Sequence, residues 1–302
     1  MILTVTLNTA LDVTYTVPAL TPHASHRVTH VAERPGGKGV NVARVLAALG
    51  HEAVVTGFAG GPTGDVVRGL LTPLPVRDAL VPVAGATRRT LAIVDASTGD
   101  TTQLNEPGPQ VTAEEWTRFV ATYEELLPSA SAVALCGSLP PGIHVGAYGE
   151  LVRRARAAGV PVLLDTSGEP LRRGIAARPD IVKPNTAELA ALTGTRDPLR
   201  ATRDARRRGA HAVVTSLGPD GLLAVTPDGT WQAAPPAPVR GNPTGAGDSA
   251  VAGLLSALVE NHPWPTRLTR ATALATATVL SPTAGEFDAA RYEELLTRVT
   301  VT

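Results

Sequence analysis

Small residues and a carboxylate stand together in the run Gly245-Ala246-Gly247-Asp248. Apolar residues then recur with the spacing of one helix face, at Val251, Leu254, Leu255 and Leu258. We expect the glycines to lie at the start of a helix, where backbone N–H groups and the helix dipole attract anions and no Cβ obstructs them. A carboxylate there suits phosphoryl transfer to an alcohol, in which a hydroxyl loses its proton while negative charge is stabilised. The alternative is that Asp248 only caps the helix, because Asp is favoured at that position.

Lysine is almost absent from the chain. Of its 27 basic residues, only Lys38 and Lys183 are lysines. Lysine offers a compact, flexible ammonium that a planar guanidinium cannot replace, so we expect these two positions to need that shape. Each lies in a segment marked by glycine or proline, within Gly36-Gly37-Lys38-Gly39 or directly before Pro184. The alternative is chance placement, since two lysines must fall somewhere.

Composition limits the kinds of partner. The chain has 302 residues, 43% of them hydrophobic, and a formal net charge of zero, so neither nucleic acid nor an anionic membrane surface is expected as the main partner. The only cysteine, Cys136, excludes an internal disulfide and fits a reducing cytoplasm. The N-terminal residues do not resemble a signal peptide, and no run reaches the roughly 20 apolar residues of a membrane helix. We therefore expect a cytoplasmic protein.

Short apolar runs alternate with helical patterns along the chain, which predicts an α/β fold with a mostly parallel sheet covered on both faces. The expected strands are Ile2–Leu7, Ala53–Phe58, Ala132–Cys136, Val160–Asp165, Asp180–Lys183 and Ala212–Ser216, with a hairpin of Leu222–Val225 and Trp231–Ala234. The expected helices, besides that following Gly245, are Val40–Leu49, Trp116–Leu127, Glu150–Ala158, Leu268–Leu280 and Ala289–Val299.

Two segments, about 12–35 and 87–106, break this rhythm and alternate like exposed strands. We expect them to form a small β lid over the carboxyl edge of the sheet, where open α/β sheets bind ligands. Residues 1–302 would then be a single domain. Because an exposed apolar strand face tends to pair with a partner, we also expect a homodimer closed through the lids.

Six segments, in this order, resemble the PfkB (ribokinase-like) carbohydrate kinases over nearly the whole chain. They are 7–12 (Leu-Asn-Thr-Ala-Leu-Asp), 36–44 (Gly-Gly-Lys-Gly-Val-Asn-Val-Ala-Arg), 136–142 (Cys-Gly-Ser-Leu-Pro-Pro-Gly), 182–188 (Val-Lys-Pro-Asn-Thr-Ala-Glu), 216–221 (Ser-Leu-Gly-Pro-Asp-Gly) and 245–249 (Gly-Ala-Gly-Asp-Ser). The likeness is greatest to the hexose-phosphate branch. It implies a ribokinase-like three-layer α/β/α sandwich with a β-strand lid. Neither a Walker A loop nor a Rossmann fingerprint is present.

The resemblance also implies a role for each matching residue. Asp248 would be the catalytic base, with the N–H groups of Gly245, Ala246 and Gly247 forming an anion hole. The implied substrate-binding residues are Asp12, Gly37 and Asn41 for sugar hydroxyls, Lys38 and Arg88 for the substrate's phosphate, and Ser138. The implied nucleotide-binding residues are Lys183, Ser216, Gly218 and Gly221. Asn185 and Glu188 would organise Mg²⁺ through water, and a requirement for a monovalent cation such as K⁺ stays open.

Some of these roles have simpler alternatives. Asn185 and Glu188 also read as an ordinary capping box at a helix start. Ser138 could simply shape a turn. Arg88 and Arg89 are adjacent on a strand, so only one of them can point into the site, and the resemblance favours Arg88.

The resemblance implies an ATP-dependent kinase that phosphorylates a ketohexose monophosphate, first of all fructose 1-phosphate to fructose 1,6-bisphosphate. Tagatose 6-phosphate is the second candidate substrate. Fructose 6-phosphate is disfavoured because Gln103 stands where the minor 6-phosphofructokinases carry an arginine. The alternative of another class is a non-catalytic sensor of sugar phosphate or nucleotide, and an intact Asp248 speaks against it.

Overall fold

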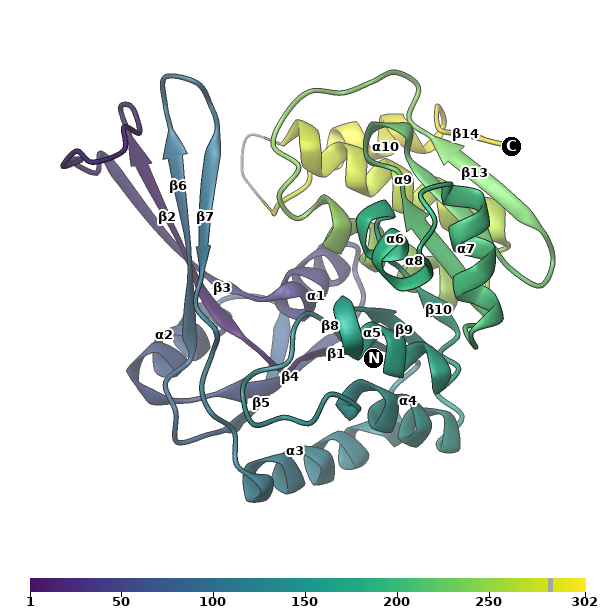
Figure 1. The fold of residues 1–302 in the computed structure, drawn as a ribbon, viewed down its shortest axis with the longest axis horizontal. Helices are drawn as coiled ribbons and strands as arrows, with labels where there is room; N and C mark the ends of the chain where they lie inside the picture. The colour runs from purple at the N-terminus through teal and green to yellow at the C-terminus, as the bar shows by residue number, and fades with distance from the viewer. Residues whose placement is uncertain (282–284) are drawn as a thin grey trace.

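The computed structural model describes residues 1–281 and 285–302. Its largest element is a ten-stranded sheet in the order β14-β13-β12-β11-β10-β9-β8-β1-β4-β5 (Figure 1). The strands are β1 Ile2–Thr6, β4 Ala53–Ala59, β5 Val76–Pro82, β8 Ala132–Cys136, β9 Val162–Asp165, β10 Ile181–Val182, β11 Ala212–Ser216, β12 Leu222–Val225, β13 Thr230–Ala234 and β14 Thr300–Val301. Seven neighbouring strands pair in parallel, in the spatial order β5, β4, β1, β8, β9, β10 and β11. The remaining strands, β12, β13 and β14, pair antiparallel. The mostly parallel sheet predicted from the sequence is confirmed.

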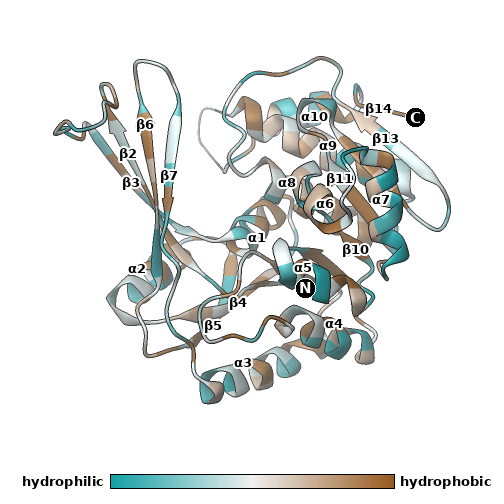
Figure 2. Ribbon diagram, in the orientation of Figure 1, coloured by the Kyte–Doolittle hydropathy of each residue, from teal (hydrophilic) through white to brown (hydrophobic). Residues whose placement is uncertain are grey.

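Helices cover both faces of this sheet, which gives the three layers expected of an α/β/α sandwich. One layer holds α1 Lys38–Ala48, α2 Gly61–Leu71, α8 Ala246–Val259, α9 Trp264–Leu280 and α10 Ala289–Leu296. The other holds α3 Ala113–Leu126, α4 Ala147–Ala157, α5 Gly168–Ala176, α6 Thr186–Thr193 and α7 Pro198–Arg207. Neighbouring strand residues such as Ala134 and Leu135 belong to opposite cores, so an inner strand such as β8 is apolar on both of its sides (Figure 2). Among the described residues, no helix is long and apolar enough to cross a membrane.

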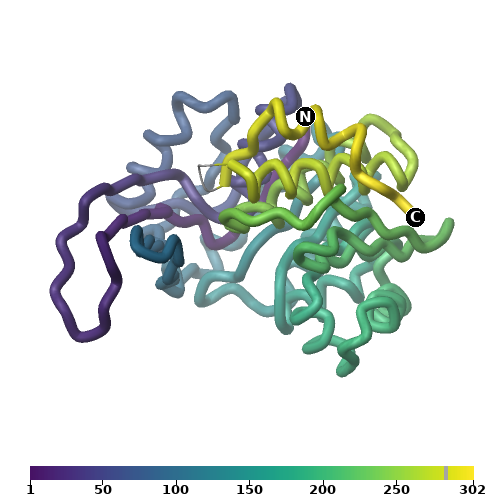
Figure 3. Tube along the Cα trace, turned by 90° about the horizontal axis from the view of Figure 1, so that it is seen from above, coloured from purple at the N-terminus to yellow at the C-terminus, as the bar shows by residue number. Residues whose placement is uncertain are grey.

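A second sheet of four strands projects from the first. Its order is β3-β2-β6-β7, with β2 Ala10–Val17, β3 His30–Gly36, β6 Arg88–Asp95 and β7 Thr101–Asn105. The loop that joins β2 to β3 extends away from the rest of the chain (Figure 3). These strands occupy the two segments expected for the lid. Strand β1 stops at Thr6, one residue before the predicted end at Leu7, and Asp12 lies inside β2.

Other differences from the sequence prediction concern short or glycine-rich elements. Helix α2 was not foreseen, because Gly61, Pro62, Gly64 and Gly69 lower its helix propensity. Strand β5 and helix α5 were also not foreseen, and α6 was expected only as the helix that the capping box of Asn185 and Glu188 would begin. The C-terminal helix ends at Leu296 rather than Val299, and the edge strand β14 follows three residues later.

The helix that begins at residue 246 is held by close packing against α9. Gly253 of α8 lies so near α9 that a Cβ built on it would be 2.7 Å from the Ala271 Cα and 2.9 Å from the Ala271 nitrogen. No side chain fits there without moving one helix. The position of the Gly-Ala-Gly-Asp turn therefore depends on a glycine two turns away.

We predict that Gly253→Ala lowers stability by about 1–3 kcal/mol, because overpacking forces the two helices apart. Gly69→Ala is the matched control: it also lies inside a helix, but a Cβ there meets nothing within 4 Å. This control should raise stability by about 0.5–1 kcal/mol through the higher helix propensity of alanine. Denaturant midpoints measure both effects, and equal shifts in the two variants would contradict the close packing of α8 on α9.

Candidate active site

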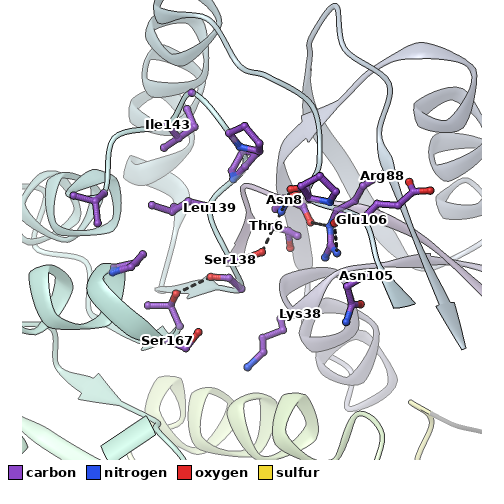
Figure 4. A pocket seen from close by; sticks show the side chains of 18 of the residues that line it. Thr6, Asn8, Lys38, Arg88, Asn105, Glu106, Ser138, Leu139, Ile143 and Ser167 are labelled. Atoms are coloured by element: carbon purple, nitrogen blue, oxygen red, sulfur yellow. Dashed lines mark hydrogen bonds between the residues drawn. The ribbon is translucent and has the colours of Figure 1, made fainter. Parts of the chain in front are cut away.

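A cavity of about 800 Å³ opens at the carboxyl edge of the large sheet, where the small sheet begins (Figure 4). Loops after β1, β7, β8 and β9 form its wall. The polar and charged side chains in that wall include Thr6, Asn8, Lys38, Arg88, Asn105, Glu106, Ser138, Thr166, Ser167 and Glu188. Three residues predicted to bind substrate, Lys38, Arg88 and Ser138, thus face one cavity. Its basic side chains suit an anionic ligand.

The two lysines of the chain meet at one buried carboxylate. Lys38 lies in the first turn of α1, and its Nζ donates to both Asp165 oxygens, at 3.2 and 3.1 Å. Lys183 follows β10, is 4% exposed, and has its Nζ 3.7 Å from Asp165 Oδ1. Although burial opposes the charge on Lys38, the nearby Asp165 and Asp248 carboxylates raise its pKa above the ordinary value. Both lysines are therefore held at the carboxyl ends of the central strands.

Asp248 lies in the first turn of α8 and is 8% exposed. Its Oδ2 accepts a 2.9 Å hydrogen bond from the Asn41 side chain, which fixes the orientation of the carboxylate. Burial raises the pKa of Asp248 to about 6, against the opposing attraction of Lys38. A carboxylate with this pKa is a better proton acceptor than an exposed aspartate and is still ionised at neutral pH.

The helix-capping alternative for Asp248 is wrong. The N-cap of α8 is Gly245, in a left-handed conformation with φ of 85°, and no side chain caps the helix. A Cβ on Gly245 would lie 2.6 Å from the Gly285 Cα, so only glycine fits there. One part of the expected anion hole is already engaged, because the Ala246 N–H donates to the Pro243 carbonyl at 3.1 Å.

Arg88 is fixed by backbone acceptors. Its Nε donates to the Asn8 carbonyl at 3.1 Å, and one terminal nitrogen donates to the Glu106 carbonyl at 3.3 Å. Arg89 points away from the cavity and pairs with the Glu106 carboxylate at 2.9 Å. The strand alternation expected for these two neighbours is present, with Arg88 on the cavity side.

Asp12 and Gly37 lie beside the cavity rather than in its wall. The Asp12 carboxyl group covers Gly36, where a Cβ would come within 2.1 Å of it. Burial raises the pKa of Asp12 to about 6, although Arg88 opposes this shift. Gly37 is the N-cap of α1, with a φ of 99° that favours glycine. Both residues therefore adjoin the helix that carries Lys38 and Asn41.

The segment that follows Lys183 forms the capping box foreseen as an alternative. Asn185 Oδ1 accepts from the Glu188 N–H and Glu188 Oε2 accepts from the Asn185 N–H, both at 2.8 Å. Glu188 also faces the cavity, so capping leaves it within reach of a ligand. Of the residues expected at a nucleotide, Ser216 ends β11 beside Asn185, and Gly218 and Gly221 bound the turn that follows it. None of these three lines the large cavity.

Two residues of the site received no role from the sequence. Asp165 ends an apolar strand, and a carboxylate at that position was the available signal. Asn8 is buried, and its side-chain nitrogen donates to the Pro107 carbonyl at 3.0 Å and to Ser138 Oγ at 3.1 Å (Figure 4). It thus joins the end of β1 to two walls of the cavity.

Known proteins resemble the chain over most of its length. A 1-phosphofructokinase from Rhodobacter capsulatus is 43% identical over 262 residues, which cover 85% of this chain and 83% of that protein. The crystal structure of phosphofructokinase-2 from Escherichia coli in complex with potassium superposes with a TM-score of 0.91, at 30% identity and with 98% of each chain covered. A possible 1-phosphofructokinase from Thermotoga maritima gives a TM-score of 0.90 at 27% identity, covering 100% of this chain and 99% of the other.

The resemblance seen in the six sequence segments is thereby confirmed. Residues 4–290 match the pfkB family of carbohydrate kinases, and they include every site residue described above. The fold agrees with this match, since solved phosphofructokinase structures superpose over nearly the whole chain. The chain belongs to the pfkB carbohydrate kinase family.

Proposed function

We propose that the chain is an ATP-dependent kinase that converts fructose 1-phosphate to fructose 1,6-bisphosphate. The observation that carries this proposal is the buried Asp248 at the start of α8, which does not line the cavity itself but interacts with the charge of Lys38, a residue of the cavity wall together with Arg88. Similarity to a 1-phosphofructokinase supports the choice of substrate. Residues 1–302 would act as one kinase domain with the small sheet as its lid. The unpaired thiol of Cys136 fits a cytoplasmic location.

In this proposal Asp248 is the general base. The primary hydroxyl of the sugar gives its proton to Asp248 while its oxygen attacks the γ-phosphorus of ATP. The bond from that phosphorus to the β,γ-bridging oxygen breaks, and ADP leaves with the electron pair. The N–H groups of Gly245 and Gly247 and the N-terminal dipole of α8 stabilise the charge of the transferring group. Ala246 joins them only when its N–H releases the Pro243 carbonyl.

The phosphate already present on the sugar would bind at Lys38 and Arg88. Arg88 keeps donors beyond the two used for its backbone anchors, and a guanidinium suits bidentate contact with phosphate. Asp12, Gly37 and Asn41 would hold sugar hydroxyls, and Ser138, which accepts from the Asn8 side chain in the cavity wall, would add a further contact. A neutral sugar would leave the charges of Lys38 and Arg88 unused.

The nucleotide would bind along Lys183, Ser216, Gly218 and Gly221, at the carboxyl ends of β10 and β11. Carboxylate and amide oxygens are suitable ligands for Mg²⁺, so Asn185 and Glu188 fit a magnesium site that is reached through water, since each also serves the capping box. Mg²⁺ would neutralise phosphate charge there. We include a monovalent cation such as K⁺, because the related phosphofructokinase-2 binds potassium.

The second candidate substrate is tagatose 6-phosphate, which carries the same charge but has its phosphate on C6 rather than C1 and the opposite configuration at C4. Fructose 6-phosphate is disfavoured only by the sequence resemblance, in which neutral Gln103 replaces an arginine of the minor 6-phosphofructokinases, because Gln103 does not line the cavity. A non-catalytic sensor is disfavoured by the buried, oriented Asp248, since such a protein needs no base.

Asp248→Asn should lower kcat by about 10³-fold, because the amide cannot accept the proton. Binding of ATP and phosphosugar should persist. In the unaltered protein, kcat/KM should fall as the pH drops below about 6, where Asp248 becomes protonated. A coupled assay of ADP release measures the rates, and retention of activity within a few-fold of the parent would remove Asp248 from the role of base.

Arg88→Ala should raise KM for the phosphosugar by about 10–100-fold and change KM for ATP little, because a charge-assisted contact with one substrate is lost. Arg89→Ala is the matched control, since this neighbour is exposed and paired with Glu106. Steady-state kinetics with each substrate varied in turn compare the two variants. Equal effects of Arg88→Ala on both KM values would place it outside the substrate's phosphate site.

We also propose a homodimer closed through the small sheets. Val13, Tyr15, Leu91 and the 55% exposed Leu104 line a second cavity on the face of this sheet. Sedimentation equilibrium should give twice the chain mass of 31.1 kDa. Leu104→Glu should reduce the mass to that of one chain, whereas Leu280→Glu on another surface should not. A single-chain mass for the parent protein would refute the dimer.

A further inference from the structure

Asp165 is a negative charge at the centre of a site that must receive two anionic substrates. Its side chain is 1% exposed and ends β9, and it faces both lysines of the chain. A fixed carboxylate repels phosphate, so its position opposes substrate binding taken alone. Its presence calls for a benefit that outweighs this repulsion.

Fold stability does not supply that benefit. A buried ion pair is on average no more stabilising than apolar residues of the same volume, and β9 is otherwise wholly apolar. The three charged groups come from separate elements, namely the start of α1, the end of β9 and the residue after β10. The pairings of Lys38 and Lys183 with Asp165 therefore connect the sugar side of the proposed site with its nucleotide side.

The same carboxylate acts on the proposed base. The groups that face Asp248 are Lys38 and Asn41 on α1, Asp165 at the end of β9, Lys183 after β10, and the Cys136 thiol at the end of β8. Lys183 lies against this turn, since a Cβ on Gly247 would be 3.6 Å from its Nζ. The lysines favour the ionised form of Asp248, and Asp165 disfavours it.

We propose that Asp165 is a positioning residue that holds the ammonium groups of Lys38 and Lys183 beside the first turn of α8, one for each substrate. The inference rests on the proposed kinase function. Lysine side chains are long and flexible. The Asp165 carboxylate, as the counter-charge of both lysines, fixes their ammonium groups at the place where the γ-phosphoryl group would pass from ATP to the sugar. The negative charge of Asp165 also keeps Asp248 more basic than the lysines alone would allow.

The test is Asp165→Asn, which keeps the size of the side chain and removes its charge. We expect kcat to fall by about 100-fold, as reacting groups lose their alignment. We also expect the acid limb of the pH profile of kcat/KM to move down by about one pH unit, because Asp248 loses a negative neighbour. A purely structural role would lower activity without moving this limb.

Asp180→Asn is the matched control. Asp180 precedes β10 at the opposite end of the strands, and its carboxylate accepts from the Val162 N–H at 2.8 Å without a lysine partner. This variant should leave the acid limb in place. If Asp165→Asn also leaves it in place, or moves it upward, the proposal is overturned. Should Asp165→Asn fail to fold, Lys38→Gln provides the opposite test. Loss of this positive neighbour of Asp248 should move the acid limb of kcat/KM to higher pH. An unmoved limb would show that Asp248 does not respond to these charged neighbours and would overturn the proposal.

A second readout does not require kinase activity. Because Asp248 has a raised pKa in the folded state, its ionisation costs stability, and this cost develops as the pH rises from about 4 to about 6. Asp248→Asn should therefore raise the melting temperature by an increasing amount over that range. In the Asp165→Asn background this gain should be smaller, and an equal gain would refute the coupling. This result stands even if no tested sugar is phosphorylated, so failure of the proposed function and failure of this inference are separable.

Discussion

The site depends on bringing two carboxylates and two ammonium groups together at the carboxyl edge of the large sheet, with Asp165, Asp248 and Lys183 buried and Lys38 open to the cavity. Each charge would be costly alone in such a place, and their mutual attraction offsets the cost. Asp165 pairs with both lysines, and Asp248 is oriented by Asn41 and stabilised by Lys38. The balance leaves Asp248 with a raised pKa and keeps Lys38 charged. A base and two anion-binding cations therefore coexist a short distance from a cavity that can hold a phosphosugar.

The fold supplies this arrangement through a few close approaches of backbone. Gly253 lets α8 pack against α9, and Gly245 lets the chain turn sharply into α8 beside Gly285. Gly36 makes room for the Asp12 carboxyl group where the small sheet leaves the large one. At each position a Cβ would displace an element that carries a site residue. Chemistry at the sheet edge thus depends on these three glycines, of which only Gly245 has a proposed contact with a substrate.

The sequence alone predicted the parts of the site that are encoded locally. The start of α8 was visible because small residues precede a helical repeat, and Lys38 and Lys183 were visible because lysine is otherwise absent. The capping box at Asn185, which the sequence offered as an alternative to a magnesium site, is likewise present. The structure was needed to show that both lysines meet at Asp165, since that meeting depends on the pairing of β8, β9 and β10 rather than on spacing. Helix α2 was not predicted because its glycines lower the local helix propensity, and tertiary packing stabilises the helix instead.

The most direct test of the account compares kcat/KM for fructose 1-phosphate, tagatose 6-phosphate, fructose 6-phosphate and free fructose, with Mg-ATP and coupled detection of ADP. We predict the highest value for fructose 1-phosphate. Free fructose should be worse by a factor on the order of 10³, because it leaves the charged groups of Lys38 and Arg88 without their partner. Equal or faster phosphorylation of free fructose would contradict the assignment of these residues to a substrate phosphate. Absence of ADP release with all four sugars would contradict the proposed kinase activity on these substrates.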